Sequence, residues 1–161
     1  MTAAPHLAVA VATGLWCSNL VGGLISYKSS PLCLAAQAGT AFIAGTASHF
    51  VLDALPHNDG IYNTFLGTGP VLAVELVIIT SIIFSISRFR ELPLLIIFAG
   101  FVGGAWPDLV SRFGESLVGK NQLMTVLNNF HSFCHSSYTP ALIPSTIFQE
   151  LVAIIALLLL F

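Results

Sequence analysis

The sequence predicts an all-α protein, a polytopic transmembrane helical bundle of about five spans plus one interfacial amphipathic helix, in a single domain over residues 1–161. Only 7% of the 161 residues are charged, whereas soluble globular domains carry about 25%. Hydrophobic residues make up 56% of the chain, and the mean hydropathy is +0.91. This composition excludes a disordered chain, a basic nucleic-acid-binding protein and an ordinary soluble enzyme. We therefore expect the lipid bilayer as its surroundings.

Five apolar stretches have about the length that a membrane-spanning helix needs, which is about 20 residues for about 30 Å of hydrocarbon. They cover residues 7–27, 32–55, 69–87, 92–106 and 140–161. The fourth is short because we expect Pro107 to end it. The most polar stretch follows, at residues 112–137, and predicts an interfacial amphipathic helix and loop. Small residues are frequent in the first two spans and predict close helix packing.

Five spans would divide the polar segments between two faces of the membrane. Face A holds the N-terminus, the 56–68 loop and the 107–137 segment, and face B holds the 28–31 and 88–91 loops and the C-terminus. Three basic residues fall on face B and two on face A, so the positive-inside rule favours face B as cytoplasmic. The expected location is a bacterial-type inner membrane, with face A turned away from the cytoplasm.

The histidines and several acids of the chain gather at face A. All five histidines fall at or near it: His6, His49, His57, His131 and His135. His49 precedes Asp53 by four residues, and His131 precedes His135 by four, so each pair would share one helix face. Paired imidazole and carboxylate ligands at this spacing are typical of sites for divalent metals such as zinc. Asp108, directly after Pro107, is a further candidate ligand.

Carboxylates within membrane spans need a partner or a function. An aspartate at mid-helix costs about 2.5–3.5 kcal/mol on the insertion scale, and metal ligation would offset that cost. We therefore expect metal ligands at His6, His49, Asp53, His57, Asp108, His131 and His135. Glu75 and Asp59 are candidates for a general base, and Glu75 can also be a metal ligand or a buried partner in a hydrogen bond between helices.

Three short motifs resemble those of the YdjM-like integral membrane metal-dependent hydrolases. Residues 48–57, SHFVLDALPH, are similar to the S-H-x-x-x-D element of that family. Residues 106–109, WPDL, are similar to its P-D element, and residues 131–136, HSFCHS, to a shortened H-R-G-x-T-H-S element. His6 matches an early histidine of the family. The first motif is also similar to a metal-binding segment of zinc-dependent phospholipase C and the single-strand-specific nucleases.

The resemblance implies a helical fold with a site for two or three metals that hydrolyses phosphoesters. Together with the face A cluster, it predicts a membrane-embedded hydrolase that binds one to three divalent ions, zinc foremost, and acts on an amphipathic phosphoester such as a phospholipid. Two other functions are compatible with the residues: a metal or proton transport protein, and a non-catalytic scaffold with a structural histidine cluster. The expected partners are the bilayer and the substrate, with no nucleic acid, and a homo-oligomer fits any of these functions.

Overall fold

A computed structural model describes residues 2–24, 30–58, 60, 68–135 and 137–160, and confirms the all-α fold class. The described part of the chain holds six helices and no strand. They are α1 (Ala3–Leu24), α2 (Pro31–Ala54), α3 (Thr68–Phe89), α4 (Leu94–Val118), α5 (Gln122–Cys134) and α6 (Leu142–Leu158).

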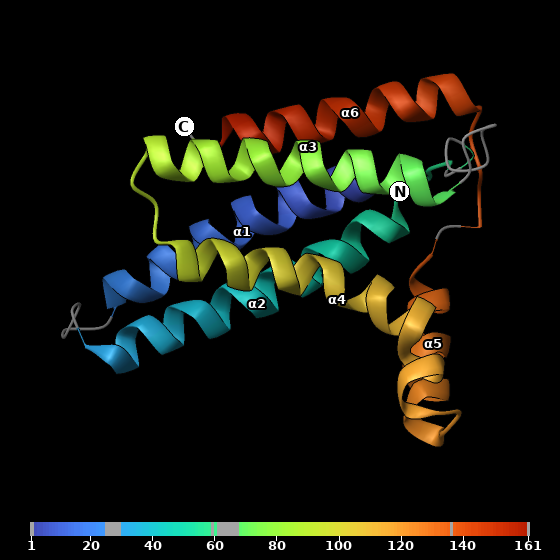
Figure 1. Ribbon diagram of the computed structural model, residues 1–161, viewed down its shortest axis with the longest axis horizontal. Helices are drawn as coiled ribbons and strands as arrows, with labels where there is room; N and C mark the ends of the chain where they lie inside the picture. Colours follow the sequence, from blue (N-terminus) through green and yellow to red (C-terminus); the bar gives the residue numbers. More distant parts are fainter. Residues whose placement is uncertain (1, 25–29, 59, 61–67, 136, 161) are drawn as a thin grey trace.

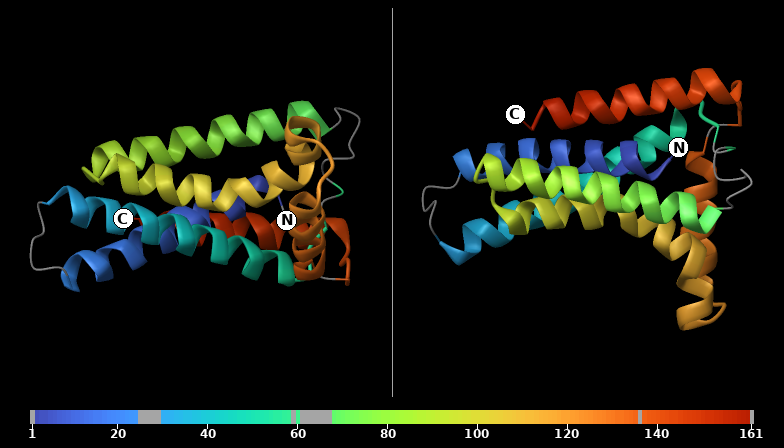
Figure 2. Two further views of the ribbon diagram at one scale, coloured as in Figure 1. Left: turned by 90° about the horizontal axis from the view of Figure 1, so that it is seen from below. Right: turned by 45° about the horizontal axis from the view of Figure 1, so that its top comes forward.

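The five long helices run along the bundle in alternating directions, and α5 lies across one end of it (Figure 1). The same end holds the start of α1, the end of α2 and the start of α6, as a second view also shows (Figure 2). It is therefore the end predicted as face A, and we keep that name for it. The interfacial helix is shorter than predicted, because residues 112–118 of the expected 112–137 segment belong to α4.

Three helices are long and apolar enough to cross a membrane, namely α1, most of α3, and α4. Helix α6 is apolar but has 17 residues, a length of about 25 Å at 1.5 Å per residue. Helix α2 has 24 residues, but it combines many small residues with Gln37, His49 and Asp53. The chain is thus compatible with an integral membrane protein. That α2 and α6 also cross the membrane, which would make five spans, stays a prediction.

The prediction that Pro107 ends the fourth span is wrong, because α4 continues through it to Val118. Proline cannot donate a hydrogen bond to the carbonyl four residues earlier, which belongs to Gly103. The hydroxyl of Thr46 on α2 donates to that carbonyl at 3.1 Å. A neighbouring helix therefore replaces the lost partner, which is how membrane helices tolerate proline. As a result Asp108 lies within α4, next to α2, and not at a helix end.

The core of the bundle is the packing of α1, α2 and α4 through glycines. A Cβ atom at Gly45 of α2 would lie 2.5 Å from the carbonyl oxygen of Gly100 on α4. A Cβ atom at Gly104 would lie 2.5 Å from the Cβ of Ala10 and 3.1 Å from the carbonyl oxygen of His6, both on α1. The predicted close approach of small residues is thus confirmed at Gly45, although Gly39 of the same helix has nothing within 4 Å of its Cβ position.

We expect Gly45→Ala to destabilise the bundle and Gly39→Ala to leave it unchanged or more stable. The first substitution drives a methyl group into the α4 backbone, at a cost of about 1–3 kcal/mol. The second adds helix propensity of about 0.5–1 kcal/mol where space is open. Thermal unfolding of both variants in detergent, followed by tryptophan fluorescence, measures the difference. Equal melting temperatures for the two variants would contradict this account of the packing.

Candidate metal centre

His49 and Asp53 occupy the last turns of α2 and point into the bundle at face A. The helix begins with the Ser30 side chain accepting from the backbone N–H of Cys33, with Pro31 in its first turn. It ends at Ala54, before Pro56. Both side chains are almost fully buried, with His49 at 0% exposure and Asp53 at 1%. Their four-residue spacing brings Nε2 of His49 within 3.1 Å of Oδ2 of Asp53, as the sequence predicted.

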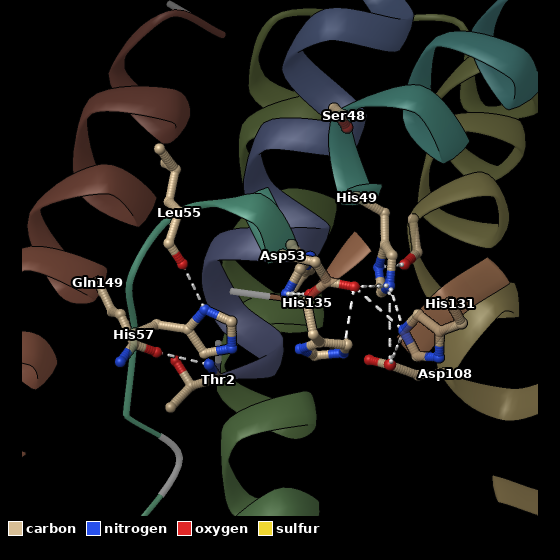
Figure 3. Close-up of polar contacts among 12 residues, drawn as sticks. Thr2, Ser48, His49, Asp53, Leu55, His57, Asp108, His131, His135 and Gln149 are labelled. Carbon is tan, nitrogen blue, oxygen red and sulfur yellow. Dashed lines mark hydrogen bonds and ion pairs between the residues drawn. The ribbon is translucent and has the colours of Figure 1, made fainter. Parts of the chain in front are cut away.

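Four histidines direct their Nε2 atoms at the carboxylate of Asp53 (Figure 3). His131 and His135 from the α5 segment lie 3.0 and 3.4 Å from Oδ2, the oxygen that His49 also faces. His6 from the first turns of α1 lies 3.3 Å from Oδ1. The carboxylate of Asp53 therefore joins α1, α2 and the end of α5, three segments far apart in the sequence.

Asp108 contributes a second carboxylate from α4. Its Oδ1 lies 3.6 Å from Nε2 of His49 and 3.4 Å from Nε2 of His131. In contrast to Asp53, its side chain is 54% exposed. The cluster thus has a closed side at Asp53 and an open side at Asp108.

These side chains form three overlapping groups whose ligand atoms lie within 4.8 Å of one another. The groups are His6, His49 and Asp53; His49, Asp108 and His131; and Asp53, His131 and His135. They hold six of the seven predicted ligands. The cluster could hold a metal ion, and Asp53 and Asp108 supply negative charge that a cation would balance.

The hydrogen bond of His49 to α4 decides which of its ring nitrogens can bind a cation. Nδ1 lies 2.8 Å from the carbonyl oxygen of Gly104, which can only accept, so Nδ1 carries the proton. In the neutral ring the lone pair is then on Nε2, which faces Asp53, Asp108 and Nε2 of His131 at 3.3 Å. Such an arrangement of acceptors needs a further proton or a cation among them. Histidine ligands of metals commonly donate their other N–H to a backbone carbonyl in this way.

His6 also presents Nε2 to the cluster. Its ring packs against that of His49, with centroids 4.2 Å apart. Nδ1 of His6 is buried and has no hydrogen-bond partner among the residues that the structure describes. The contacts of the ring to the cluster are thus made on the Nε2 side, toward Asp53.

Helix α5 presents His131 and His135 from its C-terminal end. The Asn121 side chain accepts from the backbone N–H of Met124 and caps the start of the helix, and His135 follows its last residue. The hydrogen bond to Asp53 raises the pKa of His131, whereas burial lowers the pKa of His135. His135 therefore favours the neutral form, which is the form that binds metal.

The remaining predicted residues lie outside these three groups. His57 is buried, its Nδ1 lies 2.7 Å from the carbonyl oxygen of Leu55, and its ring centroid lies 5.5 Å from that of His135. Glu75 lies on α3, where Oε1 accepts from the backbone N–H of Ala4 at 2.8 Å. Asp59 falls outside the described residues. Sequence reasoning missed Gly104, whose role rests on its carbonyl, a group that every residue type has.

Comparison of the chain with protein family models, with curated proteins and with solved structures found no match. The resemblance to the YdjM-like hydrolases therefore stays a prediction from the three motifs. The chemistry of the site has to be inferred from its own residues.

We expect the purified protein to bind at least about one divalent ion per chain. The variants Asp53→Asn and His131→Ala should lose most of the bound metal, because each substitution removes a group that contacts several others in the cluster. Asp108→Asn should weaken binding less, since its side chain is half-exposed and contacts two histidines. Elemental mass spectrometry after dialysis measures the content. Glu115→Gln, an exposed acid on the same helix α4, is the control. Full metal content in Asp53→Asn would contradict the assignment.

Chelation should destabilise the wild-type protein and leave Asp53→Asn unaffected. A ligand present at 100 times its dissociation constant stabilises the folded state by about 2.7 kcal/mol. For a chain of this size that corresponds to a melting temperature about 5–10 °C higher. The measurement is thermal unfolding with EDTA and again after zinc is restored. A wild-type melting temperature that chelation does not change would show that no ion holds the cluster together.

Proposed function

We propose that this protein is a membrane-embedded, metal-dependent hydrolase that acts on phosphoesters at face A, with zinc as its preferred ion. The observation that carries the proposal is the orientation of His49. Its Nδ1–H is held by the Gly104 carbonyl, and its Nε2 faces two carboxylates and a second imidazole. A cation in their midst would balance the charge of the two carboxylates, which otherwise need protons from the histidines.

The spacing of the ligand atoms supports zinc. Bonds of about 2.0–2.1 Å in tetrahedral geometry place two ligand atoms about 3.3 Å apart. Nε2 of His49 lies 3.1 Å from Oδ2 of Asp53 and 3.3 Å from Nε2 of His131. Nε2 of His131 lies 3.4 Å from Oδ1 of Asp108. These separations suit ligands that share one small ion, and imidazole with carboxylate is a donor set that zinc accepts.

The open side of the cluster supports catalysis over a purely structural role. A bound zinc ion supplies a Lewis acid and makes water acidic near neutral pH. Asp53 and the histidines around it are buried and would hold the ion, whereas Asp108 is 54% exposed and leaves an approach for water and substrate. A structural site is normally closed on all sides by protein ligands. Asp59 is a candidate for the general base. Glu75 is less suitable, because its Oε1 already accepts a hydrogen bond from the backbone N–H of Ala4.

The place of the site supports an amphipathic substrate. Face A is one end of a bundle in which three helices are apolar enough to cross a membrane. A site at that end would meet the headgroup level of the bilayer, where phospholipids present their phosphoesters. We further propose that the protein is integral to a bacterial-type inner membrane, with face A turned away from the cytoplasm.

Zinc-loaded protein in detergent should hydrolyse a chromogenic phosphodiester or a phospholipid. Asp53→Asn and His131→Ala should lower kcat/KM by about a hundredfold or more, a loss of about 2.7 kcal/mol in transition-state stabilisation. Glu115→Gln should retain the wild-type rate, because Glu115 is exposed and belongs to none of the three ligand groups. Release of the coloured alcohol from the chromogenic phosphodiester and mass spectrometry of the lipid products measure the two reactions.

The outcomes separate the three functions. Hydrolysis that follows metal content across the variants supports the hydrolase. Metal bound at full stoichiometry without hydrolysis of any phosphoester would overturn it and favour the scaffold. Zinc uptake into sealed proteoliposomes, lost in Asp53→Asn, would overturn it in favour of transport.

A further inference from the structure

A groove runs between α3 and α6 on the side of the bundle away from α2. Both helices pack on α1 rather than on each other, and residues of both line one pocket together with Thr2 and Ala4 at the start of α1. The space between them is a cavity of about 430 Å³, within the range of about 300–1,000 Å³ for small-molecule sites. Its walls are aliphatic, with Ile78 and Ile82 on α3 and Ile154 and Leu157 on α6.

The walls of the groove differ from the helix-packing surfaces of this chain. Where α1, α2 and α4 meet, glycines allow backbone contact, as at Gly45 and Gly104. Among the residues that the structure describes, no glycine lines the groove, and its α3 wall is mostly β-branched valine and isoleucine. Only 17% of the most apolar window of α3 is buried within the protein. Membrane helices associate through small residues, so this surface suits a flexible hydrocarbon chain better than another helix.

The length of the groove matches one leaflet of a bilayer. Its lining on α3 extends from Pro70 to Ile82, about 18 Å at 1.5 Å per residue. One leaflet contributes half of a hydrocarbon core of about 30 Å, or about 15 Å. A single acyl chain of a phospholipid therefore fits along the groove from one end to the other.

The polar groups of the groove lie toward face A, near the metal cluster. Thr2, Glu75 and Glu150 line it there, and none of the described residues that line it is basic. The backbone N–H of Ala4, two residues before His6, donates to Glu75. The backbone N–H of Thr2 donates to Gln149 of α6, whose amide donates to the carbonyl of Asn58, next to His57. The start of α1 thus contacts both the groove and the cluster.

We propose that the α3–α6 groove binds one acyl chain of a bilayer phospholipid and thereby holds the lipid with its ester and headgroup region toward the metal cluster. The esterified end of a phospholipid chain is uncharged, so unlike a free fatty acid it adds no third carboxyl group beside Glu75 and Glu150. The inference rests on the proposed function, since it names the lipid as the substrate class of that same site.

The test uses the full-length protein in phosphatidylcholine vesicles that contain a phosphatidylcholine with a photoactivatable acyl chain. After illumination, peptide mass spectrometry should find the label on groove residues of α3 and α6. Ile78→Trp and Ile154→Trp fill the groove and should lower that labelling severalfold. Val77→Trp and Ile155→Trp are the matched controls, because these exposed neighbours lie outside the groove, and they should label as wild type. Labelling spread evenly over all lipid-facing residues would overturn the proposal. A cross-linked dimer in which the partner chain shields α3 from the label would overturn it as well.

Asp53→Asn separates this inference from the proposed function. The variant loses the metal cluster but keeps the groove, so it should label as wild type. If the wild-type protein is labelled in the groove but hydrolyses no phosphoester, the α3–α6 groove proposal stands and the hydrolase proposal is overturned. If the wild-type protein hydrolyses a phosphodiester but is not labelled in the groove, the hydrolase proposal stands and the α3–α6 groove proposal is overturned.

Discussion

The carboxylate of Asp53 is the group on which the architecture at face A depends. It is 1% exposed, and among the described residues it pairs with histidines rather than with lysine or arginine. A buried carboxylate is tolerated only when several donors or a cation satisfy it. The imidazoles around it come from α1, α2 and α5, so these segments meet at one point. The transverse position of α5 follows from this requirement as much as from its amphipathic sequence, because His131 has to reach Asp53.

A second constraint, the proline in α4, positions the helix against this centre. Pro107 leaves the Gly103 carbonyl without its helical partner, and Thr46 of α2 supplies one. One residue further, the Gly104 carbonyl accepts from His49. Two consecutive carbonyls of α4 are therefore bound by side chains three residues apart on α2. The glycines permit the close approach of the backbones, and the approach in turn fixes the tautomer of His49. The close packing of α2 and α4, the hydrogen bond to the Gly103 carbonyl and the orientation of His49 all follow from this one helix contact.

Features of the fold and of the site that depend on the local spacing of residues could be predicted from the sequence. Apolar runs and polar interruptions located the helices, and the four-residue spacing of His49 and Asp53 placed both on one face of α2. Other features depend on partners that no spacing reveals. The predicted end of the fourth helix is wrong because the Gly103 carbonyl finds its hydrogen-bond donor on another helix, at a residue more than fifty positions away in the sequence. The sequence leaves Glu75 open as a ligand, a base or a buried hydrogen-bond partner, and only its tertiary contact with the backbone of Ala4 distinguishes these roles.

The start of α1 links the two features that a lipid-acting enzyme would need. Within five residues it offers Thr2 and Ala4 to the groove and His6 to the metal cluster. Thr2 is held by Gln149 of α6, and Ala4 by Glu75 of α3. The two helices that wall the groove are therefore anchored to the same short segment that carries a metal ligand. The groove and the metal cluster are therefore neighbouring features of the fold, joined through the backbone of one short segment at the start of α1.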